Sequence, residues 1–253
     1  MKQITNTNRR RFIGCSLCAL FTWKNALTKN IVNNGCIISN DEVYRLLNNH
    51  NTFTFSSKKI KTVPVSGDQY FDRALGRQLV RLANTFNVEP SFTYAYNFMN
   101  ASASTYTTIK GTKGSVFFGL DYLKKIMSLG MGGDITVLGI CAHEFAHIHQ
   151  FFGSINYSFL KKYPTSKLTE LHADLIAGYF IQYIKSIRPN INTHTFVKFM
   201  TSIGSYRYWL ANFHGTPSER YLAVKTGMKL WGNSITFEEA AWHGAKIILK
   251  KFK

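Results

Sequence analysis

The sequence is short of acidic residues, cysteine and proline. It has 13 Asp and Glu against 31 Lys and Arg, with four Cys and five Pro. Four Cys in 253 residues are too few for a fold held together by disulfides. No stretch reaches the about 18 uninterrupted apolar residues of a membrane-spanning helix, which excludes a multi-span membrane protein. With 45% apolar and 15% aromatic residues, the chain has ample material for a folded core.

The formal net charge is +18. Such a charge attracts anionic polymers, including those of a cell envelope, by a long-range force that salt screens. No helix-turn-helix, RNP motif or zinc-finger spacing accompanies it, so we expect no specific nucleic-acid partner. A solvated, lysine-rich surface without a polymer partner is the simpler interpretation.

Residues 1–30 resemble an export signal. They contain six Lys and Arg and no acidic residue, and a largely apolar run extends from Phe12 to Trp23. A basic segment before a short apolar stretch is typical of secretory signals, and Arg9 and Arg10 resemble the pair of a twin-arginine signal. We therefore expect an exported protein that is periplasmic, envelope-associated or secreted. An ordinary basic tail is the alternative.

Beyond this segment we expect one domain, 31–253, with a less regular N-terminal part at 31–68. Short aromatic and β-branched runs separated by glycines are typical of a small antiparallel sheet. Apolar periodicity and capping residues then predict a mostly helical body, so the fold class is α+β. The expected strands are 52–55, 60–65, 92–98, 105–109 and 115–118. The expected helices are 41–49, 69–86, 134–153, 168–187, 195–212 and two that open with capping boxes at Thr216–Glu219 and Thr236–Glu239.

The helix expected from its N-cap Asp134 to Gly153 contains the motif HEFAH at His143–His147. Residues four apart lie one turn apart on the same helix face, so His143 and His147 can bind one tetrahedral zinc ion. Glu144 lies about 100° from His143, beside the ion, where it can take a proton from zinc-bound water. A pair of ordinary surface or core histidines is the alternative.

A third ligand is expected from the next helix. Its segment ELHAD places Glu170 and Asp174 four residues apart, and hence on one face. Two acids on one buried face repel each other, so one should bind the metal and the other should act beside it. We assign Glu170 to zinc, one ion per chain, and Asp174 to the orientation of a ligand histidine through its ring N–H. His149 and His172 are interpreted as ordinary polar histidines.

Together, HEFAH and ELHAD resemble the gluzincin zinc metallopeptidases, specifically a soluble member of the HtpX-like and CaaX-protease-like family. The segments 100–103 and 114–119 resemble that family's Asn-Ala segment and the strand before its active-site helix, and His214 to Arg220 resembles its His-Pro…Arg motif. Pro does not directly follow His214 here, and the membrane-spanning helices of the integral members are absent. A second, soluble zinc peptidase family has a similar set of motifs, so the subfamily stays open.

The resemblance implies a zincin-like fold and a peptidase that hydrolyses a peptide or protein substrate by Glu144-assisted attack of zinc-bound water. It also implies that His214 stabilises the oxyanion, and that Arg220 either braces His214 or pairs with Asp174. An ordinary loop histidine near a helix N-terminus is the alternative for His214. We further expect the strand at 115–118 to offer an edge on which an extended peptide can bind, with a core strand as the alternative.

Two other functions stay open at this point. The chain could be a non-catalytic zinc-containing envelope protein that binds anionic polymers through its basic surface. It could also hydrolyse a non-peptide amide, or peptides within a cell-wall polymer. Glu144 counts against the non-catalytic function, because a structural zinc site needs no acid beside the metal.

Overall fold

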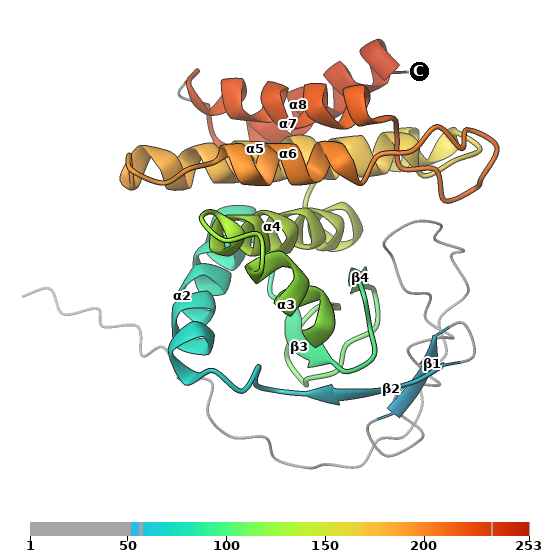
Figure 1. The fold of residues 1–253 in the computed structure, drawn as a ribbon. Coiled ribbons are helices and arrows are strands. Elements are labelled where there is room, and N and C mark those ends of the chain that lie inside the picture. The colour runs from blue at the N-terminus through green and yellow to red at the C-terminus, as the bar shows by residue number, and fades with distance from the viewer. Residues whose placement is uncertain (1–51, 56–57, 234, 253) are drawn as a thin grey trace, which may run out of the picture. The chain divides into compact units, whose positions relative to one another are not determined.

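The computed structural model describes residues 52–55, 58–233 and 235–252 (Figure 1). The export segment predicted at 1–30 and the helix predicted at 41–49 lie outside these residues. The described elements are β1 (Thr52–Phe55), β2 (Lys58–Val63), α2 (Gln69–Phe86), β3 (Ser91–Ala95), β4 (Ala101–Ser104), β5 (Ser115–Gly119), α3 (Leu120–Met127), α4 (Gly133–Phe152), η1 (Ser158–Lys162), α5 (Lys167–Ile187), α6 (His194–Ser202), α7 (Pro217–Trp231) and α8 (Phe237–Phe252).

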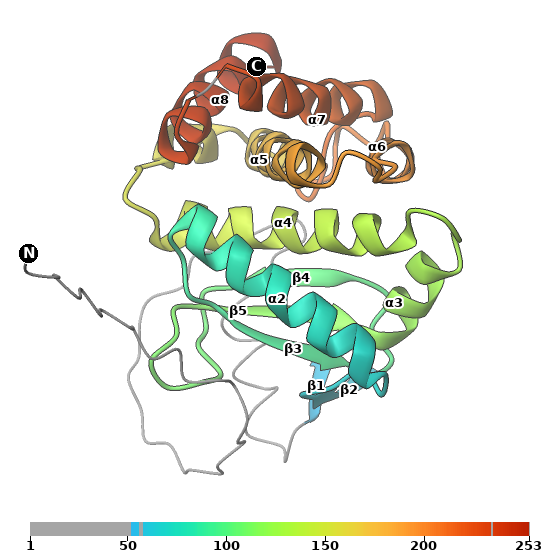
Figure 2. The same cartoon turned by 90° about the vertical axis from the view of Figure 1, so that its left-hand side faces the viewer.

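Sheet and helices are stacked in layers (Figure 2). Helix α4 lies between the sheet and α5, and α7 and α8 lie on the opposite side of α5. Helices α2 and α3 pack against α4. The fold is therefore α+β, a small sheet on a mostly helical body, which confirms the predicted class. Within the described ranges, no helix is both long enough and apolar enough to cross a membrane.

The sheet is mixed, so the prediction of a purely antiparallel sheet is wrong. Its order is β1-β2-β3-β5-β4, and β5 pairs in parallel with β3 and antiparallel with β4. The chain leaving β3 passes over the end of β5, where the Gly119 N–H donates to the Asn100 carbonyl at 2.9 Å. A Cβ at Gly119 would overlap the carbonyl of Phe98, so only glycine permits this crossing. The crossing makes β5 central and β4 the edge strand, so the edge predicted at 115–118 is also wrong.

The strand predicted at 105–109 is absent, because this segment forms bends. The side chain of Ser115 forms hydrogen bonds with this segment. Ser115 Oγ donates to the carbonyl of Tyr106 at 2.7 Å and accepts from the Thr108 N–H at 3.1 Å. Such side-chain bonds replace the backbone ladder that a strand needs. The strand forms instead at Ala101–Ser104.

Helix α4 is buried along most of its length, as expected for a helix that is apolar on all sides. Its N-cap is Gly132, not Asp134 as predicted. Gly132 has a φ of 97°, which glycine adopts without strain, and a Cβ there would crowd the side chain of Thr195. Asp134 lies in the first turn, where the helix dipole favours a carboxylate. The C-cap is Gly153, as predicted.

The backbones of α7 and α5 are in direct contact where the two helices cross. A Cβ at Gly227 would overlap the carbonyl oxygen of Leu175, so the absence of a side chain permits the contact. The predicted capping box opens α7: the Thr216 N–H donates to Glu219 Oε2 at 2.8 Å, and the Glu219 N–H donates to Thr216 Oγ1 at 3.2 Å. This box fixes the first turn of α7, which contains the buried Arg220.

Helix α6 ends at Ser202, so the prediction of a helix to Asn212 is wrong. Residues 203–216 form a connection that we call the α6–α7 loop. Its ends are joined by a hydrogen bond of 3.0 Å from the Ser205 N–H to the Gly215 carbonyl. Gly204 also lies against the backbone of Thr216 and Pro217. A helix continued through this segment could not bring these residues together.

Candidate metal centre

The two histidines of HEFAH face each other in the interior. Their Nε2 atoms are 3.1 Å apart, and the rings are nearly perpendicular, at 87°. His143 and His147 are both buried on α4, which packs between the sheet and α5. The spacing of four residues therefore aligns two nitrogen ligands on one helix face, as the sequence predicts.

Helix α5 brings the third predicted ligand to the same point. Glu170 Oε2 lies 3.3 Å from His143 Nε2, and Glu170 Oε1 lies 3.4 Å from His147 Nε2. The Glu170 side chain is fully buried. The three side chains are the one group of His, Cys, Asp and Glu in the described residues whose ligand atoms converge on a single point.

Asp174 holds His143 from the other side of the ring. Its Oδ1 lies 2.9 Å from His143 Nδ1 and accepts a hydrogen bond of 2.7 Å from Arg220 Nη2. Of the two partners considered for Arg220, the contact in the structure is with Asp174. This contact places a carboxylate oxygen beside His143 Nδ1, where it would favour a proton on that nitrogen.

A second chain of hydrogen bonds holds His147, and it was not predicted from the sequence. His172 Nε2 donates to the Ala241 carbonyl on α8 at 2.9 Å, so its Nδ1 accepts from Gln150 Nε2 at 3.0 Å. Gln150 Nε2 also donates to the Thr169 carbonyl at 2.9 Å, and its Oε1 accepts from His147 Nδ1 at 2.9 Å. Gln150 follows His147 by three residues, a helical spacing that could have indicated the contact.

These two sets of partners favour, in both ligand histidines, the tautomer with the proton on Nδ1. With the proton on Nδ1, a neutral His143 and a neutral His147 each present an unprotonated Nε2. Two lone pairs then face each other at 3.1 Å, with the Glu170 carboxylate beside them. A cation between them removes this repulsion. Tetrahedral zinc with bonds of about 2.0–2.1 Å separates its ligand atoms by about 3.4 Å, close to the 3.1, 3.3 and 3.4 Å found here.

The charge of the buried site leads to the same conclusion. Three acids, Glu144, Glu170 and Asp174, are opposed by one guanidinium, that of Arg220, and all four side chains are buried. This excess of buried acids over buried cations favours a bound cation at the site. The residues present therefore fit a zinc ion held by two histidines and one glutamate.

Glu144 lies next to the metal cluster but is not part of it. Burial raises the pKa of its carboxyl to about 7, against the lowering effect of His143 and His147 and of a hydrogen bond with the backbone of Ala103 in β4. Among the described residues, its Oε2 has no hydrogen-bond partner. Burial also raises the pKa of Glu170, but the neighbouring imidazoles of His214, His147 and His143 outweigh burial and hold this pKa well below its usual value. The two acids thus have different environments although both are buried.

His214 approaches the cluster from the α6–α7 loop. Burial lowers its pKa, against the opposing charge of Glu170 nearby. Its Nε2 is buried and has no hydrogen-bond partner among the described residues. An imidazole nitrogen left free at the edge of the cluster is available to a bound molecule.

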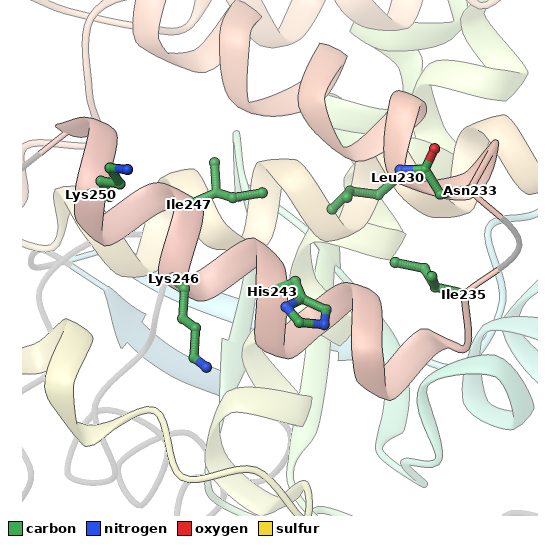
Figure 3. A pocket seen from close by; sticks show the side chains of 7 residues that line it. All are labelled: Leu230, Asn233, Ile235, His243, Lys246, Ile247 and Lys250. Carbon is green, nitrogen blue, oxygen red and sulfur yellow. The ribbon is translucent and has the colours of Figure 1, made fainter.

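His149, His172 and a groove on the surface lie outside this centre. His149 is buried and bonded to the Phe86 carbonyl and the Tyr157 hydroxyl, so its role is structural, and that of His172 is to support Gln150. A groove between α7 and α8 contains His243, Lys246 and Lys250 but none of the residues of the metal cluster (Figure 3).

Comparison of the chain with known protein families, curated proteins and solved structures found no match. The geometry of the site is therefore the basis for the function proposed below.

Proposed function

We propose that this protein is a zinc-dependent metallopeptidase of the gluzincin type, with His143, His147 and Glu170 as zinc ligands. The observation that carries the proposal is the position of Glu144. It is adjacent in sequence to a ligand, buried, and outside the set of metal ligands, with one carboxylate oxygen unbonded among the described residues. A site that only stabilises the fold has no use for such a group, whereas hydrolysis needs a base at this place.

Zinc bound by these three side chains supplies a Lewis acid that polarises a carbonyl and lowers the pKa of a water molecule. Glu144 accepts the proton of the attacking water and returns it to the leaving amine. His214, through its free Nε2, donates a hydrogen bond to the developing oxyanion. Asp174 with Arg220, and Gln150 with His172, hold the two ligand imidazoles in the required tautomer and orientation.

A peptide is the substrate class that the sheet favours. Edge strand β4 pairs on one side with β5 and has no strand partner on its other side among the described residues. Ala103 of this strand contributes the backbone hydrogen bond to Glu144. All four residues of β4 are buried, so a substrate would have to displace what covers this edge. An extended chain bound there by its backbone would lie next to the catalytic base.

The basic surface favours a second function, that of a non-catalytic zinc protein binding anionic polymers. Two surface grooves are lined by cations and by no acid: one contains His243, Lys246 and Lys250 (Figure 3), and the other Lys185, Lys198 and Lys225. Envelope association and export remain part of this proposal, since they rest on residues 1–30 and on the net charge of +18.

The deciding experiment compares the wild type with Glu144→Gln. The zinc content of each protein is measured by elemental mass spectrometry. Its peptidase activity is measured with a mixture of unstructured peptides. We expect one zinc per chain in both, and a loss of hydrolysis of at least about 100-fold in the variant, because general-base catalysis is worth about that much. Metal analysis also separates zinc from iron, which the same donor set suits.

Asp134→Asn is the matched control, since it removes an exposed carboxylate from the same helix. It should keep both zinc and activity. Full hydrolysis by Glu144→Gln would remove the base from the mechanism. Zinc without hydrolysis in the wild type, together with salt-sensitive binding to an anionic polymer, would favour the second function.

A further inference from the structure

Three large aromatic side chains are exposed within four residues of the α6–α7 loop. Tyr206 is 62% exposed, Tyr208 is 56% exposed and Trp209 is 77% exposed. Single exposed apolar residues are common, but a group of aromatic rings on one loop is typical of a binding surface. This loop also contains His214.

The loop is fixed beside the metal centre. The Ser166 N–H, just before α5, donates to the Ala211 carbonyl at 3.0 Å, and Ser166 Oγ donates to the Phe213 carbonyl at 3.3 Å. Ser166 in turn accepts the Glu170 N–H at 3.0 Å. Figure 1 shows the loop, in orange, beside the beginning of α5, in yellow. The rings are therefore presented from a backbone that is bonded to the helix of the third metal ligand.

The exposed tyrosine rings are in contact with a buried aromatic ring of the same loop. Tyr206 and Tyr208 have ring centroids 6.4 Å apart, and Tyr208 and Phe213 have centroids 5.1 Å apart. Phe213 is buried and directly precedes His214. The exposed tyrosine rings are thus connected to Phe213, the residue that precedes His214.

We propose that the exposed rings of the α6–α7 loop select substrates that carry a large apolar or aromatic side chain close to the cleaved bond. The proposal rests on the proposed function and names the substrate class of the same site. Burial against Tyr208 and Trp209 favours large apolar side chains such as Leu over small polar ones, and ring pairs add further contact energy for Phe, Tyr and Trp.

A membrane surface is the other ligand that exposed Tyr and Trp suit, but the charge of the loop argues against it. Arg207 is the only Lys or Arg between 203 and 216. Attachment to an anionic bilayer takes a cluster of basic residues beside the aromatic ones. A peptide side chain needs only the rings.

The test uses two labelled peptides of equal length that differ at one central position, Phe in one and Ser in the other. Their binding is measured by fluorescence anisotropy to zinc-loaded Glu144→Gln protein, which cannot cleave them under the proposed mechanism. We expect the Phe peptide to bind about tenfold more tightly than the Ser peptide. This preference should disappear in a protein that also carries Tyr208→Ser and Trp209→Ser. Tyr70→Ser is the matched control, because Tyr70 is 83% exposed on α2, and it should leave the preference unchanged.

Each outcome has a distinct meaning. Equal binding of the two peptides, or an equal loss of both in the loop variant, overturns the proposal. Loss of sedimentation with phosphatidylserine vesicles in the loop variant, with peptide binding unaffected, assigns the rings to a membrane instead. In wild-type protein, Trp209→Ser should raise KM for the Phe peptide about fivefold and leave kcat unchanged. If the wild type cleaves neither peptide while the binding preference holds, the proposed function fails and the preference of the loop stands.

Discussion

Arg220 on α7 donates a hydrogen bond of 2.7 Å from Nη2 to Oδ1 of Asp174 on α5, and both side chains are almost fully buried. The pair joins two residues 46 positions apart and continues through Asp174 to His143. It therefore connects the packing of α7 on α5 to the orientation of a metal ligand.

Replacing Arg220 by Met should destabilise the fold by about 3–5 kcal/mol, because it leaves the Asp174 carboxylate buried without its cation. Urea unfolding with a chelator present measures this effect apart from metal binding. Lys167→Met is the control: Lys167 pairs with Glu219 at 3.3 Å, but both side chains are partly exposed. Its cost should stay below about 1 kcal/mol. Equal costs for the two variants would contradict a buried ion pair at Arg220.

Removal of the metal should lower the melting temperature. Without zinc, Glu144, Glu170 and Asp174 share one compensating guanidinium, that of Arg220. Metal present at about a thousandfold above its Kd stabilises a folded protein by about 4 kcal/mol. Differential scanning calorimetry with and without EDTA measures this difference. The melting temperature of His147→Ala should respond to neither zinc nor EDTA, and a zinc-dependent shift of normal size in that variant would place the metal elsewhere.

Gln150→Leu should weaken zinc binding about 10- to 100-fold, because it removes the acceptor that keeps the proton on His147 Nδ1. Competition with a chromogenic chelator gives the affinity. Gln182→Leu changes a half-buried glutamine on α5 and should leave the affinity unchanged. An unaltered affinity in Gln150→Leu would show that the tautomer of His147 does not depend on this contact.

The local features of the site could be predicted from the sequence because they depend on helix periodicity. Spacing of four residues is enough to align His143 with His147, and the same spacing aligns Glu170 with Asp174 on α5. Capping residues likewise predicted the beginning of α7, since the box at Thr216 and Glu219 is a local interaction.

What the sequence did not predict depends on contacts between distant segments. The parallel pairing of β3 with β5 results from the crossing of the chain over Gly119. The residue pattern of a strand does not show which other strand it pairs with. The periodicity of 195–212 is compatible with a helix, but the bond between Ser205 and Gly215 closes a loop there. The spacing of Gln150 to His147 is local and could have indicated their contact. The other partners of Gln150, Thr169 and His172, come from the neighbouring helix, so the sequence does not show them.

His214→Ala should separate catalysis from metal binding. Its Nε2 is buried near Glu170 and has no hydrogen-bond partner in the part of the chain that the structure describes. This nitrogen is therefore available to form a hydrogen bond with the substrate. Loss of one donor to an oxyanion lowers kcat about 100- to 1,000-fold, whereas zinc content and KM should change little. Steady-state kinetics with metal analysis measures both, and His243→Ala on the surface of α8 is the control. A variant that loses zinc instead would make His214 part of the metal site, because an oxyanion donor is needed only from the attack of water on the carbonyl onward.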